Sequence, residues 1–528
     1  MNTIVMPRPA SMPVLVSRAL TATLALLFLL AYLYTIPAED AVILYDYAKN
    51  LASRGIITYS VHAMPIEGAT DFLWMVVIAG LKAMGVDEFA SAMVLNAVGV
   101  LLVLHAFREP KERILVGVAL LLTPYLYASL NGFSAIFFSA WYVLVLRWTL
   151  TGSRYVYLSV LVLCLIRPDG VVWGAGCLLY RAITGSGERR LGDEIRNALL
   201  CLVLPGVLYF AWRWWYFGEF LPLPFLVKAA APRDLLLFYS DSVRDVLMVL
   251  LPGALAILLS SRRKRLAVEF LALFILPAAF YSAMRLEQNI GNRFLAPMFA
   301  GIAFVLAQSD TERRAFLAFL ALAIVAQFKL TVVTFAELAS SRQENIYGVS
   351  KDLGGLQGRM LVTEAGRLAY YSNWFAEDSW GLDTPRYAHA LITPQDVSQG
   401  HYDLIVAHCE LAMLRPGTDL AHDRSRTWHN QCRSMAAAIR EGPFDVYLVP
   451  FYDGITMRER VKLWMKRDAA TAPCLRHDIY AVSKHYAQAG RLESILARYG
   501  ARKYDPRLEV QEDMVCGGAG QSAGGPSL

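Results

Sequence analysis

The sequence predicts a membrane protein of the all-α class, with about 11 transmembrane helices, followed by a C-terminal extracytoplasmic α/β domain. Two observations carry the first part. The 528 residues are 56% hydrophobic with a mean hydropathy of +0.40, which a soluble chain of this length does not sustain. The apolar residues also fall in repeated runs of about 17–20, the length that crosses a bilayer. Past Phe335 the sequence becomes polar, which marks the second part.

The first apolar run is Ala19–Ile36, and Pro37 ends it because proline cannot continue a helix. The run is too long for a signal peptide and lacks a small-residue cleavage site, so we expect it to remain as the first span. The shorter run 72–84 is about 13 residues long, which predicts an interfacial helix on the outer face instead of a span. The other predicted spans are 89–106, 113–129, 132–150, 155–167, 169–183, 197–216, 240–260, 266–284, 294–308 and 315–335.

Lys and Arg gather in loops between these runs, and cytoplasmic loops are the ones that collect them. One arrangement places every basic loop in the cytoplasm. It puts the N-terminus in the cytoplasm and residues 336–528 outside. The net charge of +6 therefore reports orientation, and no nucleic-acid partner is expected. The basic loops contain Arg108, Lys111 and Arg113; Arg147 and Arg154; Arg189, Arg190 and Arg196; Arg262, Arg263, Lys264 and Arg265; and Arg313 and Arg314.

Charged residues collect on the predicted outer face. The acids Glu39 and Asp40 directly follow the first span, and an acid at membrane depth is costly enough to indicate a function. The segment Arg167–Gly170 interrupts an apolar stretch with Arg, Pro, Asp and Gly. Lys228 and Arg293 lie at the same predicted level. A single cation there is usually a snorkelling anchor, but several cations near paired acids suit a lipid-linked phosphate.

Six short motifs, in chain order, resemble the polytopic GT-C glycosyltransferases, which use polyprenyl-phosphate sugars. Among them the chain is most similar to the bacterial terminal arabinofuranosyltransferases. The resemblance implies a GT-C fold in a bacterial inner membrane, multi-pass, with the C-terminal domain in the periplasm. The motifs are Glu39–Gly55, Glu67–Trp74, Arg167–Gly170, Tyr216–Lys228, Asn292–Pro297 and Ala369–Leu382.

The resemblance implies that Asp40 is the catalytic base, because its spacing to Gly55 matches that of the family's catalytic aspartate. A positioned carboxylate can take the proton of an acceptor hydroxyl, and a single displacement inverts the anomeric centre. Three cations, Arg167, Lys228 and Arg293, would hold the donor phosphate. The residues expected to bind substrate are Glu39, Tyr47, Glu67, Trp74 and Asp169.

The expected function is transfer of a sugar, arabinofuranose by resemblance, from a polyprenyl-phosphate donor. The acceptor would be an envelope glycan, a lipid glycan or a surface protein, and membrane lipids surround the enzyme. One alternative is a mannosyl or other hexosyl transferase of the same fold. Another is a transporter or flippase of lipid-linked saccharides, but the sequence lacks the mid-membrane charges and internal repeats typical of one. A non-catalytic scaffold is a third alternative, which the intact Glu39–Asp40 pair disfavours.

Two positions depart from the family pattern. Ser134 stands where the family has an acid in the second outer loop, and that acid contacts a metal or the acceptor in some relatives. The sequence therefore does not establish a cofactor, and a divalent cation stays an open alternative. Asp46 stands where the family has Arg, so substrate contacts in the first outer loop are expected to differ.

The predicted domains are a transmembrane GT-C module at 1–335, a soluble α/β domain at 336–514 and a disordered Gly-rich tail at 515–528. Apolar runs at Met360–Val362, Tyr402–Ala407 and Phe444–Val449 predict strands, and Tyr480–Tyr499 predicts a helix. The domain would bind the acceptor or act as a structural cap.

Cysteine usage fits an outer C-terminal domain. Three cysteines lie in apolar runs and are expected to be inert. Four lie in the C-terminal part, and an even number on an oxidising side predicts disulfides, with three pairings open. None has the CxxC spacing of a zinc site. The four are Cys409, Cys432, Cys474 and Cys516.

Overall fold

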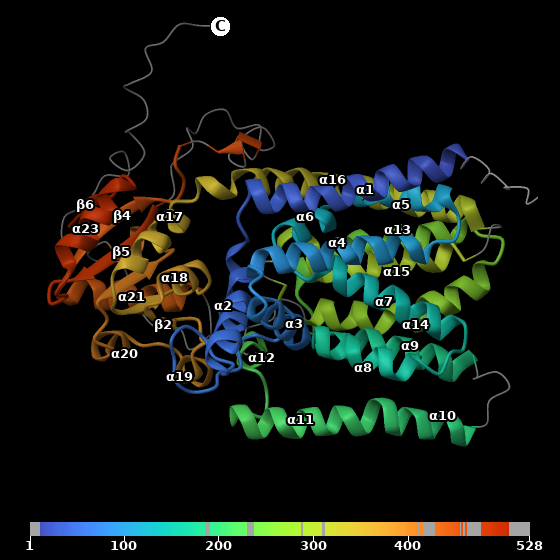
Figure 1. Ribbon diagram of the computed structural model, residues 1–528, viewed down its shortest axis with the longest axis horizontal. Coiled ribbons are helices and arrows are strands. Elements are labelled where there is room, and N and C mark those ends of the chain that lie inside the picture. Colours follow the sequence, from blue (N-terminus) through green and yellow to red (C-terminus); the bar gives the residue numbers. More distant parts are fainter. Residues whose placement is uncertain are drawn as a thin grey trace, which may run out of the picture. The chain divides into compact units, whose positions relative to one another are not determined.

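The protein is described by a computed structural model (Figure 1). Two compact units make up the chain, and each is built from separate stretches of sequence. Unit 1 comprises Met1–Thr35, Phe89–Leu208 and Leu235–Phe335; unit 2 comprises Ile36–Glu88, Tyr209–Asp234 and Ala336–Leu528. Unit 2 therefore joins two early segments to the C-terminal part. The structure describes residues 11–184, 191–229, 237–286, 289–308, 312–409, 411–414, 428–454, 456–457, 460–461 and 477–505.

Unit 1 is a bundle of apolar helices (Figure 1). Helix α9 packs on α14, α7 on α15, α13 on α14 and α1 on α5. Helices α11 and α16 continue past the unit's boundary into residues of unit 2. The helices are α1 (Met12–Tyr34), α4 (Glu88–Ala106), α5 (Pro110–Leu122), α6 (Pro124–Leu130), α7 (Ala135–Leu150), α8 (Val156–Ile166), α9 (Gly170–Thr184), α10 (Leu191–Ala198), η1 (Leu199–Val203), α11 (Leu204–Phe217), α13 (Ser240–Leu258), α14 (Arg263–Ala283), η2 (Ile290–Leu295), α15 (Ala296–Leu306) and α16 (Arg313–Ser340).

Within the described residues, five helices are long and apolar enough to cross a membrane, and a bent pair would make a sixth. Helices therefore occupy the predicted spans, while the number of about 11 crossings stays a prediction. Several predicted spans are shorter apolar helices, among them α7, α8 and α9. The five are Met12–Tyr34, Glu88–Ala106, Gly192–Phe217, Arg263–Ala283 and Arg313–Gln343.

Proline residues set the breaks in the bundle. The run 113–129, expected as one span, is wrong in detail because α5 and α6 meet there at 71°. Pro124 lacks the N–H that would continue the ladder of α5, which ends at Leu122. At the expected Arg167–Gly170 interruption, α8 ends and α9 begins. Arg167 is extended, with φ −147° and ψ 141°, as a residue before proline prefers.

Unit 2 contains the first outer segment and the C-terminal domain. Helix α2 ends at Gly55, whose φ of +69° suits glycine in a left-handed helix cap. The run 72–84 forms a helix, as expected. The helices are α2 (Glu39–Arg54), α3 (Phe72–Ala83), α12 (Leu223–Ala229), η4 (Ser341–Gln343), α17 (Asn345–Asp352), η5 (Leu353–Gly355), α18 (Arg367–Ser372), α19 (Pro385–His389), α20 (Pro394–Gln399), η6 (Leu411–Leu414), α21 (Trp428–Glu441) and α23 (Ala489–Arg498).

A six-stranded sheet forms the centre of the C-terminal domain, in the order β2-β1-β3-β5-β4-β6. Strand β1 is parallel to β2 and β3, and the remaining pairs are antiparallel. Its apolar side chains pack with those of α21 in one buried core. A small sheet domain is therefore present as expected, while its bounds of 336–514 and its extracytoplasmic position stay predictions. The strands are β1 (Arg359–Val362), β2 (Phe375–Asp378), β3 (Leu404–Ala407), β4 (Phe444–Pro450), β5 (His477–Ser483) and β6 (Arg502–Tyr504).

The helix expected over Tyr480–Tyr499 is wrong over residues 480–488. Residues up to Ser483 belong to β5, and α23 begins only at Ala489. Strand β5 lies between β3 and β4, where pairing on both sides and burial of its β-branched and aromatic residues favour the extended state.

One of the expected disulfides is present, joining Cys409 to Cys432. Cys474 and Cys516 lie outside the described residues, as does the predicted tail 515–528. The cysteines of the apolar helices, Cys164, Cys177 and Cys201, are free thiols.

Replacement of both Cys409 and Cys432 by Ala should lower the free energy of unfolding of the C-terminal domain by about 3 kcal/mol, from the loop entropy of a 23-residue separation. Limited proteolysis of the full chain in detergent measures this. The free-thiol variant Cys201→Ala is the control. Equal protease resistance in the double variant and the control would contradict the expectation.

Candidate active site

The residues expected at the site divide between the two units. Arg167, Asp169 and Arg293 belong to unit 1. The remaining expected residues all belong to unit 2 and are Glu39, Asp40, Tyr47, Glu67, Trp74 and Lys228.

The acidic pair opens helix α2 in unit 2. Glu39 and Asp40 occupy its first turn, where the partial positive charge of a helix N-terminus favours carboxylates. The preceding residue, Ala38, has no side chain that could cap the helix. Asp40 is half-buried. The carboxylate of Asp40 is thus placed by its helix, with part of its surface open to solvent.

Glu39 binds the loop that follows strand β1. Its Oε1 accepts the backbone N–H groups of Gly366 and Arg367, each at 2.8 Å. A Cβ on Gly366 would lie 2.0 Å from the carbonyl oxygen of Glu39, so this approach requires glycine. Burial raises the pKa of Glu39 to about 7, although Arg367 and the two amides oppose the rise. The structure thus gives Glu39 protein partners, and its substrate-binding role stays a prediction.

Arg367 fixes the turn that precedes Asp40. The side chain is 2% exposed and lies 3.6 Å from the carboxylate of Glu39. Its Nη2 donates to the carbonyl oxygen of Pro37 at 2.9 Å, and its guanidinium forms an ion pair with Glu344. Sequence reasoning missed this residue because it lies outside the segments that carry charged motifs.

A further carboxyl group, Glu364, was also missed. It follows strand β1, and its pKa is raised well above its usual range by burial and then by the charges of Glu39, Asp40 and Asp478. Asp478 itself accepts from His408 Nδ1 at 2.6 Å. Glu364 therefore favours holding a proton at neutral pH, whereas the pKa of Glu39, about 7, leaves that group balanced between its two forms. The predicted strand Met360–Val362 was a usable signal, since functional side chains often follow parallel strands.

Tyr47 belongs to a buried network and is fully buried. Its hydroxyl donates to Asp383 Oδ1 at 2.9 Å and accepts the N–H of Gly68 at 3.0 Å. A Cβ on Gly68 would lie 1.9 Å from Asp383 Oδ1. Burial raises the pKa of Asp383 well above its usual value, with Asp378 as the nearest charge that adds to the rise. The network joins α2, the Gly68 loop and the loop before α19.

Glu67 and Arg213 form a buried ion pair, with 2.5 Å between Oε1 and Nε. Arg213 also donates to the carbonyl oxygens of Glu219 and Phe220, each at 3.0 Å. The carbonyl oxygen of Glu67 accepts the N–H of Leu223, the first residue of α12. These bonds hold the helix that carries the half-buried Lys228.

Trp74 is 2% exposed and lies within α3. Its substrate-binding role stays a prediction.

In unit 1, Arg167 and Asp169 form a two-pronged ion pair at the α8–α9 break. The Nε–Oδ1 distance is 3.1 Å and the Nη2–Oδ2 distance is 2.7 Å. Asp169 also accepts the hydroxyl of Tyr281. A turn that served only to connect two helices would not require a buried Arg–Asp ion pair. The pairing lowers the net charge that Arg167 offers to a ligand.

Arg293 and Arg167 both lie against the ring of Phe294, at 5.0 and 4.9 Å from its centroid. Arg293 also stacks on Phe133 at 3.8 Å, and Arg167 lies 4.8 Å from Phe138. Both guanidinium groups thus contact the same ring in unit 1, and their role as phosphate ligands stays a prediction. Aromatic rings hold such planar cations without neutralising them.

The two departures from the family pattern both lie at buried positions. Ser134 is buried and precedes α7 as its N-cap residue. Asp46 accepts the N–H of Ser60 at 2.5 Å and lies 3.1 Å from Lys49 Nζ. Among the residues that the structure describes, no group of three His, Cys, Asp or Glu side chains could hold a metal ion.

Comparison with known proteins places the fold. No protein-family model and no curated protein sequence matches the chain. Its fold is similar to that of ArnT from Cupriavidus metallidurans bound to undecaprenyl phosphate, with a TM-score of 0.52 and 13% identity over 74% of this chain and 92% of that one. The apo form of ArnT aligns over the same shares with a TM-score of 0.46. The likeness concerns the fold alone: a helical, membrane-type bundle with a small sheet domain.

Asp383→Asn should flatten the pH dependence of thermal stability. The folded state holds this carboxyl protonated above its ordinary pKa of 3.8, so wild-type stability falls as pH rises from there through the raised pKa. Asparagine cannot ionise, so the unfolding temperature of the Asp383→Asn variant should decline less steeply than that of the wild type over about pH 4–9.

Asp445→Asn, at a position paired with exposed Lys503, is the matched control for the loss of one carboxyl. If the unfolding temperatures of wild type and Asp383→Asn depend on pH in the same way, the pKa of Asp383 is not raised in the folded protein, and the expectation is wrong.

Proposed function

We propose that the protein is an inverting GT-C glycosyltransferase that uses a polyprenyl-phosphate sugar and that Asp40 is its general base. The observation that carries the proposal is the placement of Asp40. It lies in the first turn of α2, which the buried Arg367 and the Glu39 carboxylate hold in position. The fold, similar to that of ArnT bound to undecaprenyl phosphate, supports a donor of that lipid class.

The chemistry follows from a good leaving group. Asp40 removes the proton of an acceptor hydroxyl as its oxygen attacks the anomeric carbon, and the bond from this carbon to the phosphate oxygen breaks. The lipid leaves as a polyprenyl phosphate, so no strong acid is needed. One displacement inverts the anomeric centre. Burial raises the pKa of Glu364 well above its usual range, so this neighbouring carboxyl group holds a proton and is not available as the base.

The donor phosphate gains charge as it leaves, and cations stabilise that charge. Arg167, Arg293 and Lys228 are proposed for this role. The stacking of Arg167 and Arg293 on one aromatic ring supports them as a pair, because it orients both guanidinium groups. Guanidinium groups bind phosphate oxygens through paired donors, which lysine cannot do.

The sugar and the acceptor are finer proposals. Arabinofuranose is the proposed sugar, on the motifs of Glu39–Gly55 and Glu67–Trp74, with a hexose as the alternative. The acceptor is proposed to be an envelope glycan, a lipid glycan or a surface protein outside a bacterial inner membrane. Hydroxyl groups of either substrate would meet polar side chains. The proposed contacts are Glu39, Tyr47, Glu67, Trp74 and Asp169.

Asp40→Asn should lower sugar transfer by at least about 100-fold, because the amide cannot accept the hydroxyl proton. The assay follows transfer by mass spectrometry, with purified protein, synthetic polyprenyl-phosphate arabinofuranose or hexose, and an envelope extract as acceptor. Asp87→Asn, at an exposed position of the same unit, is the matched control. Wild-type transfer by a folded Asp40→Asn protein would reject the base; absence of transfer from every donor would favour a transporter.

Arg293→Gln should weaken binding of polyprenyl phosphate about 10- to 100-fold, because one charge-assisted contact to phosphate is lost. Isothermal titration in detergent measures it directly, without the need for an acceptor. Arg285→Gln removes a neighbouring cation to which no role is assigned and should bind the lipid as wild type does. Equal losses in both variants would indicate a general effect of charge.

A further inference from the structure

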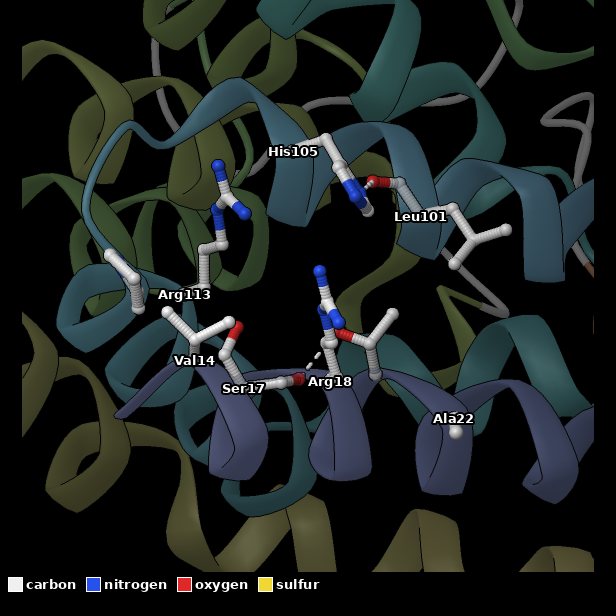
Figure 2. Close-up of a pocket in the computed structure, with 9 residues that line it drawn as sticks. Val14, Ser17, Arg18, Ala22, Leu101, His105 and Arg113 are labelled. Atoms are coloured by element: carbon white, nitrogen blue, oxygen red, sulfur yellow. Dashed lines mark hydrogen bonds between the residues drawn. The ribbon is translucent and has the colours of Figure 1, made fainter. Parts of the chain in front are cut away.

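A cavity of about 360 Å³ opens in unit 1, between α1, the end of α4 and the start of α5 (Figure 2). It is separate from every residue proposed above for glycosyl transfer. Its polar lining comes from three helices and is rich in cations. These lining side chains are Ser17, Arg18, Thr21, His105 and Arg113.

Two of the lining side chains, Arg113 and His105, are oriented by hydrogen bonds to nearby backbone carbonyl oxygens. Arg113 donates from Nε to the carbonyl oxygen of Phe107 at 2.9 Å and from Nη2 to that of Arg108 at 3.3 Å. His105 Nδ1 bonds to the carbonyl oxygen of Leu101 at 2.8 Å, which fixes the ring. Both groups are thus oriented before any ligand arrives.

Arg18 reaches the same space from α1. Figure 2 shows its guanidinium extending from α1 toward the side of the cavity where His105 lies. The residue is exposed. Three helices therefore supply one basic group each to a single opening, an arrangement that isolated snorkelling side chains do not produce.

The charge around the cavity is one-sided. No acidic residue lines it in the part of the chain that the structure describes. The nearest acids in the sequence, Glu109 and Glu112, form the capping box of α5, in which the N–H of Glu109 donates to Glu112 Oε2 at 3.3 Å. Arg108 and Lys111 lie on the same turn and offset these two acids. The cavity is therefore suited to an anion.

The apolar lining of the cavity and its position in the bundle indicate which kind of anion it binds. Val14 and Leu101 line it beside the cations, and the two helices that carry them, α1 and α4, are long enough to cross a bilayer. An apolar wall next to guanidinium groups at the end of a span fits a phosphate attached to a lipid. The basic loops predict that this end faces the cytoplasm, where lipids enter from the adjacent leaflet.

We propose that this cavity binds the phosphate headgroup of an anionic membrane phospholipid. Arg18 and Arg113 would bind phosphate oxygens by charge-assisted hydrogen bonds, and the lipid would join α1 to the α4–α5 turn. Free inorganic phosphate has the same charged group but no acyl chain that would contact the apolar residues of the lining. The proposal does not depend on the glycosyltransferase function.

Native mass spectrometry of the full chain in detergent tests this proposal, with phosphatidylglycerol compared against phosphatidylcholine of equal acyl chains. The wild type should retain phosphatidylglycerol preferentially, and Arg18→Gln should lower that occupancy about tenfold while phosphatidylcholine stays unchanged. Arg147→Gln, an exposed arginine of α7 outside the cavity, is the matched control. Arg18→Lys should restore part of the occupancy, and the unfolding temperature checks each variant's fold.

Equal retention of the two lipids, or an equal loss in Arg147→Gln, would overturn the proposal. A separate arm adds inorganic phosphate to lipid-depleted protein. Binding of phosphate that depends on Arg18, without any preference for phosphatidylglycerol, would assign the cavity to free phosphate and reject the lipid.

Discussion

Buried charge has to be paired, and this constraint organises both units. An unpaired ion in a low-dielectric interior costs several kcal/mol, so the buried residues Arg181, Arg213 and Arg367 each bind a carboxylate and carbonyl oxygens. Arg367 shows the consequence most clearly. Its contacts with Pro37, Glu39 and Glu344 satisfy one buried cation and also fix the backbone from which α2 and Asp40 start. The requirement to neutralise an arginine thereby becomes a means to position a carboxylate.

The same constraint acts in the helical bundle. Arg181 pairs with Glu194 at 2.5 Å and donates to the carbonyl oxygen of Ser153, which ties α9 to α10 and to the turn before α8. Arg167 pairs with Asp169 where a proline has already broken the helix. Such pairs add little net stability compared with apolar packing, but the loss of one partner is expensive. They therefore specify how helices meet, in a bundle whose other contacts are mostly interchangeable apolar ones.

Unequal protonation is the other theme of unit 2. Burial, together with the charges of neighbouring acids, raises the pKa of Glu39, Glu364 and Asp383, so these acids ionise less readily than usual. Neutral carboxyl groups donate as well as accept hydrogen bonds, which suits recognition of sugar hydroxyl groups. Asp40 lies in the first turn of the same helix and is half-buried. Environment, more than residue type, divides the roles among these carboxyl groups.

Local sequence determined the helices, the breaks and the strands. Apolar runs give spans because backbone groups in lipid must bond within their own helix, and Pro37, Pro168 and Gly55 end helices for steric reasons that involve only near neighbours. Our reading of the local pattern missed the 71° bend, although Pro124 is itself a local signal for it. It also missed the strand at Tyr480, where pairing with two neighbouring strands overrides the local pattern. Only the tertiary structure decided the partners of Glu39 and Tyr47. Glu39 and Arg367 are 328 residues apart, and Tyr47 and Asp383 are 336 apart. No local propensity specifies such pairs, because they form only once folding brings buried polar groups together and each must find a partner.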